Sequence, residues 1–219
     1  MTRAPASFAR VFSSPLYAVL DIEQLQGRSS SAALEGLLQG GVSVVQLRAK
    51  TLPGKEFLEL ARDARRQTRA RDCLLIINDR VDIALAARAD GVHLGQDDLP
   101  LQDARTLMGT KLIGISTHDV EQARAAESGG ADYIGFGPIF GTKTKETGYA
   151  PRGLPLLREA RHAVKIPLVA IGGITEANVV QVWQAGADAA AMISDVLGAQ
   201  DVAGKVKRIL VLGTGAGLR

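Results

Sequence analysis

The sequence is poor in cysteine and in net charge. Cys73 is the only cysteine among 219 residues, so no disulfide can form within the chain, which is typical of a reducing compartment. Its place in the apolar run CLLIIN predicts a buried and unreactive thiol. The 26 lysines and arginines nearly balance 23 acids, and a net charge of +3 argues against a nucleic-acid-binding surface.

Long apolar runs are also missing. No stretch reaches the roughly 18 apolar residues that a membrane-spanning helix requires. The opening stretch MTRAPASFARVFSSP lacks the apolar centre of a signal peptide. This stretch contains Arg and Ser but no acidic residues, as transit peptides do, but we favour a frayed leader. We therefore expect a cytoplasmic protein without membrane contacts.

Short apolar runs of strand length alternate along the chain with segments of helical periodicity. Apolar residues at three- and four-residue intervals mark segments 54–70, 81–89, 120–128 and 176–185. Continuously apolar strands that alternate with amphipathic helices indicate a parallel sheet covered by helices. The strand-like runs begin at Leu16, Val42, Cys73, Gly91, Lys111, Asp132, Pro167 and Asp188.

Eight such runs in a chain of this length favour a closed α/β fold, the (β/α)8 TIM barrel, over a doubly wound open sheet with the same alternation. The joints QGGVSVV, RADGVHL, GGADYIG and AGADAAA carry glycines that can close a helix before a strand begins. We expect one domain, with a leader over residues 1–14, the barrel over 15–212 and a tail over 213–219. Catalytic residues of such a barrel lie where strands end and helices begin.

Cationic side chains end the second predicted strand. Gln46, Arg48 and Lys50 occupy alternating positions, so their side chains point to one side of an extended chain. Arg offers a planar fork to phosphate oxygens and Lys a mobile point charge, and together they suit a polyanion. The alternative is a solvated Arg and Lys on an ordinary loop.

Carboxylates follow the next two predicted strands. Asn78 and Asp79 end the third, and the fourth continues to Asp97 and Asp98. Two acids from separate strand ends, with an amide, suit Mg²⁺, which takes one or two carboxylates, waters and phosphate oxygens. Alternatively, Asp97 or Asp98 could cap the helix that follows.

Hydroxyls and glycines occupy the remaining strand ends. Ser116 and His118 follow the fifth run, and the loop 137–148 after the sixth is rich in hydroxyls and lysines, as in loops that close over a substrate. Gly173 ends the seventh run and Ser194 the eighth, where many barrels hold a phosphate. The sequence thus predicts two anion sites at one rim: the cations and acids with a metal, and the neighbourhood of Gly173 and Ser194.

The strings QLRAK, IINDR, GVHLGQDDL, IGIS, GPIFGTKTK and AIGGI, in this order and spacing, resemble the thiamine phosphate synthase family over roughly residues 16 to 200. The resemblance implies an enzyme that joins 4-amino-2-methyl-5-hydroxymethylpyrimidine diphosphate to 4-methyl-5-(2-hydroxyethyl)thiazole phosphate, with Mg²⁺ as cofactor and diphosphate as the second product. It implies small-molecule partners only, and leaves a homo-oligomer open.

The resemblance also assigns site residues. Asp79 and Asp98, rather than Asp97, would bind the magnesium ion. Arg48, Lys50, Ser116 and Lys145 would be catalytic. The pyrimidine diphosphate would contact Gln46, Arg48, Lys50, Asn78, Ser116 and Lys145, and the thiazole phosphate would contact Thr142, Lys143, Thr144, Gly173, Ile193 and Ser194.

Two other functions fit parts of the same pattern. A thiazole tautomerase of the same fold would use His118 to shuttle a proton and would need no metal. A non-catalytic module that binds phosphate or thiamine would need the anion sites alone. The joint presence of Arg48, Asp79, Asp98 and Lys145 favours the synthase, because a tautomerase has no diphosphate to hold.

Overall fold

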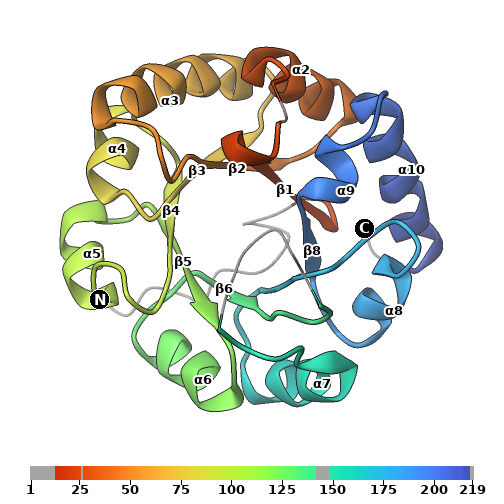
Figure 1. Cartoon of the computed structure of the whole chain (residues 1–219). Helices are drawn as coiled ribbons and strands as arrows, with labels where there is room; N and C mark the ends of the chain where they lie inside the picture. The colour runs from red at the N-terminus through yellow and green to blue at the C-terminus, as the bar shows by residue number, and fades with distance from the viewer. Residues whose placement is uncertain (1–12, 26, 142–147, 218–219) are drawn as a thin grey trace.

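The computed structural model describes residues 13–25, 27–141 and 148–217. Eight parallel strands pair in sequence order, and the last pairs with the first, so that the sheet closes into a barrel surrounded by helices (Figure 1). The strands are β1 (Leu16–Asp21), β2 (Val44–Arg48), β3 (Leu74–Asn78), β4 (Gly91–Leu94), β5 (Leu112–Thr117), β6 (Tyr133–Phe136), β7 (Leu168–Ile171) and β8 (Ala189–Met192).

Each predicted helical segment and strand-like run has its counterpart, so the expected (β/α)8 barrel is confirmed. None of the helices in the described ranges is both long and apolar enough to cross a membrane. The helices are η1 (Ile22–Gln24), α2 (Ser30–Gly40), α3 (Gly54–Arg69), α4 (Val81–Ala86), α5 (Leu101–Met108), α6 (Val120–Ser128), α7 (Gly153–Ala163), α8 (Val179–Gln184), α9 (Ser194–Leu197) and α10 (Val202–Gly215).

The core has two layers because strand side chains alternate in direction. Along β1, Leu16, Ala18 and Leu20 point outward and pack under the helices in the larger apolar cluster. Tyr17 and Val19 belong to a smaller cluster inside the barrel, built from several strands. This smaller cluster fills the lower part of the interior, and several of its side chains form the floor of a pocket that opens above it.

The last helix, α10, closes the ring of helices by packing against α2 (Figure 1). Gly40 permits this close approach, since a β-carbon there would lie 2.5 Å from Cβ of Val206 on α10. Residues 1–12 of the predicted leader lie outside the described residues, and α10 continues to Gly215. The domain limits stay predictions.

Aspartates clamp the amino-terminal end of the barrel. Asp90, Asp132 and Asp188 each precede a strand, and one oxygen of each accepts a backbone hydrogen bond of 2.8 Å from the strand before. The same oxygen pairs with an arginine of an outer helix. The backbone donors are Leu75, Ile113 and Leu168, and the arginines are Arg65, Arg105 and Arg161. We call these contacts the aspartate clamps; they lie opposite the end where catalytic residues are expected.

Candidate active site

A pocket opens at the carboxyl ends of the strands. Of the residues predicted from the sequence, it is lined by Gln46, Arg48, Asn78, Ser116, Gly173, Ile193 and Ser194. These residues come from β2, β3, β5, β7 and β8 or from the turns that follow them. Thr142, Lys143, Thr144 and Lys145 lie outside the described residues. Lys50, Asp79 and Asp98 are not among its lining residues, so the pocket joins Arg48 of the first predicted anion site to Gly173 and Ser194 of the second.

Arg48 is held by two carboxylates that the sequence reasoning missed. Asp21 ends β1 directly beside Arg48 at the end of β2. The Arg48 Nη1 atom lies 2.5 Å from Asp21 Oδ2 and 3.4 Å from Glu23 Oε2. Since Arg48 and Asp21 both line the pocket, the ion pair fixes the guanidinium at the pocket wall before any ligand arrives.

Glu23 also organises the loop that carries Lys50. Its Oε1 atom accepts hydrogen bonds from the Lys50 amide at 2.7 Å and from the Thr51 amide and hydroxyl at 3.1 Å each. Burial would raise the pKa of the Glu23 carboxyl, but hydrogen bonds from Asp21, Thr51 and Lys50 outweigh it and lower the pKa to about 2. Glu23 is therefore ionised and ties the end of β2 to η1 after β1.

Asp21 titrates in the opposite direction. It is fully buried. Burial and the neighbouring Glu23 raise the pKa of its carboxyl from 3.8 to about 6, against the lowering effect of Arg48. The folded protein thus holds this proton more tightly than the unfolded chain, so the contribution of Asp21 to the free energy of unfolding is largest below pH 3.8 and declines as the pH rises to about 6.

The variant Asp21→Asn should therefore gain stability at high pH only. We expect the free energy of unfolding to rise by about 1–3 kcal/mol at pH 8 and to change little at pH 3.5, because asparagine mimics the protonated acid. Urea unfolding at both pH values measures the difference. Asp63→Asn, which breaks an exposed pair with Arg66, is the control and should shift stability little at either pH. A loss of stability at pH 8 for Asp21→Asn would contradict the prediction.

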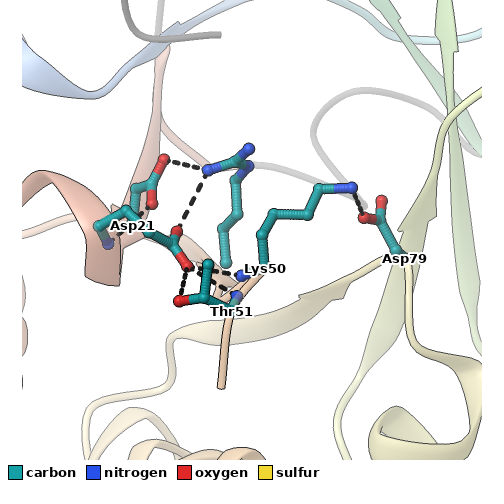
Figure 2. Close-up of polar contacts among 6 residues, drawn as sticks. Asp21, Lys50, Thr51 and Asp79 are labelled. Atoms are coloured by element: carbon teal, nitrogen blue, oxygen red, sulfur yellow. Dashed lines mark hydrogen bonds and ion pairs between the residues drawn. The ribbon is translucent and has the colours of Figure 1, made fainter. Parts of the chain in front are cut away.

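Lys50, in the loop after β2, forms an ion pair with Asp79, which follows β3. Figure 2 shows this ion pair on one side of the Lys50 loop and Asp21 and Thr51 on the other. Asp79 follows β3 in a left-handed backbone conformation (φ 62°), which is uncommon for residues other than glycine but which aspartate adopts more readily than most. Its amide donates to the His93 carbonyl at 2.8 Å, which holds the turn in place.

Asp79 and Asp98 form an acidic pair at this rim. Burial raises the pKa of the Asp79 carboxyl, the hydrogen bond from Lys50 lowers it, and the hydrogen bond and charge of Asp98 raise it, so that the net shift is upward. Asp98 is partly buried and accepts a 2.6 Å hydrogen bond from the Gly95 amide, whereas Asp97 is exposed. Like charges brought together in this way are relieved by a cation between them.

This donor set fits magnesium. In the described ranges no group of three or more His, Cys, Asp or Glu side chains surrounds a possible metal position. Two carboxylates alone match an ion that completes its shell with water and substrate phosphate oxygens rather than with a full protein cage. The predicted ligands Asp79 and Asp98 are thus neighbours, as a shared ion requires.

The opposite wall of the pocket is glycine-rich. Gly172 and Gly173 have φ values of 101° and 63°. A β-carbon on Gly173 would lie 2.8 Å from Cβ of Phe140, and one on Gly172 would lie 2.6 Å from Cα of Pro138, so only glycine fits. Ser194 and Ile193 line the same wall. The backbone of this wall is therefore packed tightly against residues 138–141, and Ser194 lies beside it in the pocket lining.

His118 lies in the pocket wall, where its ring contacts other residues of the protein. Its Nδ1 atom lies 2.6 Å from the Gly137 carbonyl oxygen, and its ring stacks on Tyr149 with centroids 3.9 Å apart. The guanidinium of Arg152 packs on the Tyr149 ring, 4.8 Å from its centroid. The arrangement places His118 in a fixed orientation beside the predicted loop.

The sequence reasoning also missed residues inside the barrel. Tyr17, His93 and Tyr133 line the bottom of the pocket and are hydrogen-bonded to one another and to predicted site residues. The period-two alternation of β1 could have identified Tyr17 and Asp21, because both share the inward face with Val19. The contacts themselves join residues up to 116 positions apart and leave no local pattern.

Comparison with known proteins identifies the family. Residues 16–196 match the family model described as thiamine monophosphate synthase. The chain is 52% identical over 190 residues to the thiamine-phosphate synthase of Halalkalibacterium halodurans, covering 86% of this chain and 90% of that protein. It is 47% identical over 206 residues to that of Chloroflexus aurantiacus, covering 94% and 95%.

A solved structure agrees. Thiamine phosphate pyrophosphorylase from Pyrococcus furiosus superposes with a TM-score of 0.85 at 37% identity, over 92% of this chain and 96% of that one. The fold, the pocket at the strand ends and the similarity along nearly the whole length lead to one conclusion. This chain belongs to the thiamine monophosphate synthase family.

Proposed function

We propose that this chain joins 4-amino-2-methyl-5-hydroxymethylpyrimidine diphosphate to 4-methyl-5-(2-hydroxyethyl)thiazole phosphate, giving thiamine phosphate and diphosphate. The observation that carries the proposal is one pocket with a cationic, carboxylate-bearing rim at one side and a glycine and serine wall at the other. Such a pocket matches a diphosphate donor and a phosphorylated acceptor that must meet. The family membership supports the same reaction.

Diphosphate departure is the step that the cationic rim assists. When the bond between the pyrimidine methylene carbon and the bridging oxygen breaks, its electron pair leaves with the diphosphate. Arg48 would receive this charge with a guanidinium that Asp21 and Glu23 already orient, so little reorganisation is needed. Lys50 would exchange its contact with Asp79 for one with the phosphate oxygens, and Ser116 would donate its hydroxyl proton to the same group.

Asp79 and Asp98 are the residues that would hold a magnesium ion at this rim. Bound there, the ion would supply charge neutralisation to the leaving diphosphate. Lys145 of the loop outside the described residues would add a further cation.

The second half of the reaction needs no side-chain nucleophile. The carbon left behind is cationic and is stabilised by the electron-rich aminopyrimidine, and the thiazole nitrogen donates its lone pair to form the new C–N bond. Gly173, Ile193 and Ser194 would hold the thiazole phosphate, together with Thr142, Lys143 and Thr144 of the loop. Apolar side chains of the pocket, among them Val169 and Ile171, would limit the access of water to the cation.

The test is turnover with both substrates. The purified protein, incubated with the pyrimidine diphosphate, the thiazole phosphate and Mg²⁺, should release diphosphate and thiamine phosphate in equal amounts. Omitting either substrate, or adding a chelator, should stop product formation. Proton exchange into the thiazole without any condensation would support a tautomerase instead, and tight binding of either phosphate compound without turnover would support a binding module.

A further inference from the structure

A continuous line of hydrogen bonds crosses the inside of the barrel beneath the pocket. Gln46 Nε2 donates to the Tyr17 hydroxyl at 2.9 Å, and the Tyr17 and Tyr133 hydroxyls lie 2.9 Å apart. The Tyr133 hydroxyl lies 3.2 Å from His93 Nδ1, and His93 Nε2 lies 2.9 Å from Ser116 Oγ. We call these five residues the interior relay. Its two ends, Gln46 and Ser116, are both predicted substrate contacts.

The relay is a built feature of the fold. Each member comes from a different strand: β1, β2, β4, β5 and β6. Tyr17 and Tyr133 are at most 2% exposed and His93 is 9% exposed. A β-carbon on Gly114 would overlap the Tyr133 ring, and one on Gly135 would lie 3.0 Å from His93 Cε1, so glycines keep this space open. Burial raises the pKa of both tyrosine hydroxyls, which therefore stay protonated and able to donate.

An anion at Ser116 sets the direction of every bond in the relay. Phosphate oxygens only accept, so Ser116 must point its one proton at them and must itself accept from His93 Nε2. In the neutral imidazole, a His93 that donates from Nε2 has an unprotonated Nδ1, which accepts from Tyr133. Because Tyr133 donates its hydroxyl proton to His93, its oxygen accepts from Tyr17. The oxygen of Tyr17 in turn accepts from an amide N–H of Gln46.

The geometry of Gln46 agrees with this direction. Its Nε2 atom is the one directed at Tyr17. The amide oxygen of Gln46 is consequently left to accept a hydrogen bond from a ligand in the pocket. Two requirements follow for the ligand: an anionic group beside Ser116 and a hydrogen-bond donor beside Gln46.

We propose that Tyr17, Tyr133 and His93 are positioning residues that orient Gln46 and Ser116 as one unit and so select a ligand with a donor at one end and an anion at the other. This inference rests on the proposed function. In the proposed substrate the exocyclic amine is the only donor on the pyrimidine ring, since the ring nitrogens accept. The relay therefore distinguishes the 4-amino pyrimidine from its 4-oxo analogue, which presents an acceptor at that position.

Substrate preference tests the relay more directly than rate alone. The variants are Tyr17→Phe, which removes the partner of the Gln46 amide, and Tyr133→Phe, which interrupts the relay in the middle. Both keep the ring and its packing. The measured quantity is the ratio of kcat/KM for the 4-amino pyrimidine diphosphate to kcat/KM for the 4-oxo diphosphate, with equilibrium binding of both diphosphates measured in parallel.

We expect each variant to lower this ratio about 10-fold. A Gln46 side-chain amide that is free to rotate by about 180° can offer either its oxygen or its nitrogen, and so can bind either analogue. The double variant should lower it no further than either single variant, since one break already uncouples the two ends. Thr68→Val is the matched control: it removes a buried hydroxyl from α3 that donates to the Arg65 carbonyl, and it should leave the ratio unchanged.

The outcomes separate this inference from the proposed function. If the wild-type protein makes no thiamine phosphate, the proposed function fails, and the binding ratio still tests the relay. If the wild-type protein turns over and both phenylalanine variants keep the ratio within about twofold, the relay has no orienting role. A fall in thermal stability with an unchanged ratio would likewise overturn the inference, because it is what a purely structural role produces.

Discussion

Replacing Asp98 with asparagine should lower kcat by about 10²–10³-fold, the usual consequence of removing one preorganised electrostatic contact from a transition state. The side chain of asparagine keeps an oxygen that can accept from the Gly95 amide, so the turn after β4 should persist. What is lost is one of the two negative charges proposed for the metal. The Mg²⁺ concentration for half-maximal activity should therefore rise along with the fall in kcat.

Asp97→Asn is the matched control for this prediction. Asp97 is adjacent in sequence and is also an aspartate, but it is exposed. Its replacement should leave kcat within about twofold and the Mg²⁺ dependence unchanged, as for most surface substitutions. If both variants lost activity equally, or if Asp98→Asn kept the wild-type Mg²⁺ dependence, Asp98 would not be a metal ligand.

Replacing Arg48 with methionine should lower kcat/KM by about 10²–10³-fold. The unbranched side chain fills a similar space, but it cannot donate to the diphosphate. It also leaves the buried Asp21 carboxylate without its cation, which should destabilise the protein near neutral pH. A fall in activity by itself would therefore mix a chemical effect with a folding effect.

The double variant Asp21→Asn/Arg48→Met separates the two effects. Removing both charges should restore the free energy of unfolding to near the wild-type value while activity stays low, since a pair replaced together leaves no unpaired buried charge. Urea unfolding and steady-state kinetics on the same preparations measure both. Recovery of activity in the double variant would show that Arg48 acts only through stability.

The fold was predictable because its signals are local. Each strand coincides with a mostly apolar run, and glycine joints such as Gly41 and Gly186 take positive φ values of 96° and 103° where a helix gives way to the next strand. The alternation of Gln46 and Arg48 along β2 likewise placed both in the pocket, since residues two apart on a strand share a face. These features need nothing beyond a few neighbouring residues.

The rest of the site depends on pairs that the sequence separates. Asp21 meets Arg48 only because β1 and β2 are adjacent in the barrel with Asp21 opposite Arg48 in register. Register between parallel strands depends on the packing of the whole barrel rather than on the residues of either strand. The same applies to His93. Its position on β4 suggests an inward side chain, but its hydrogen bonds to Ser116 on β5 and Tyr133 on β6 depend on the side-chain conformations of all three residues.

The aspartate clamps bear on how this protein can change. They tie strands to outer helices at the end of the barrel remote from the pocket, through Asp90, Asp132 and Asp188. The clamps therefore stabilise the scaffold without depending on the loops around the pocket. Loops at the pocket end can be exchanged without breaking the clamps as long as the contacts of Asp21, Glu23 and Arg48 are kept, which makes this barrel a starting point for grafting recognition of other phosphorylated heterocycles.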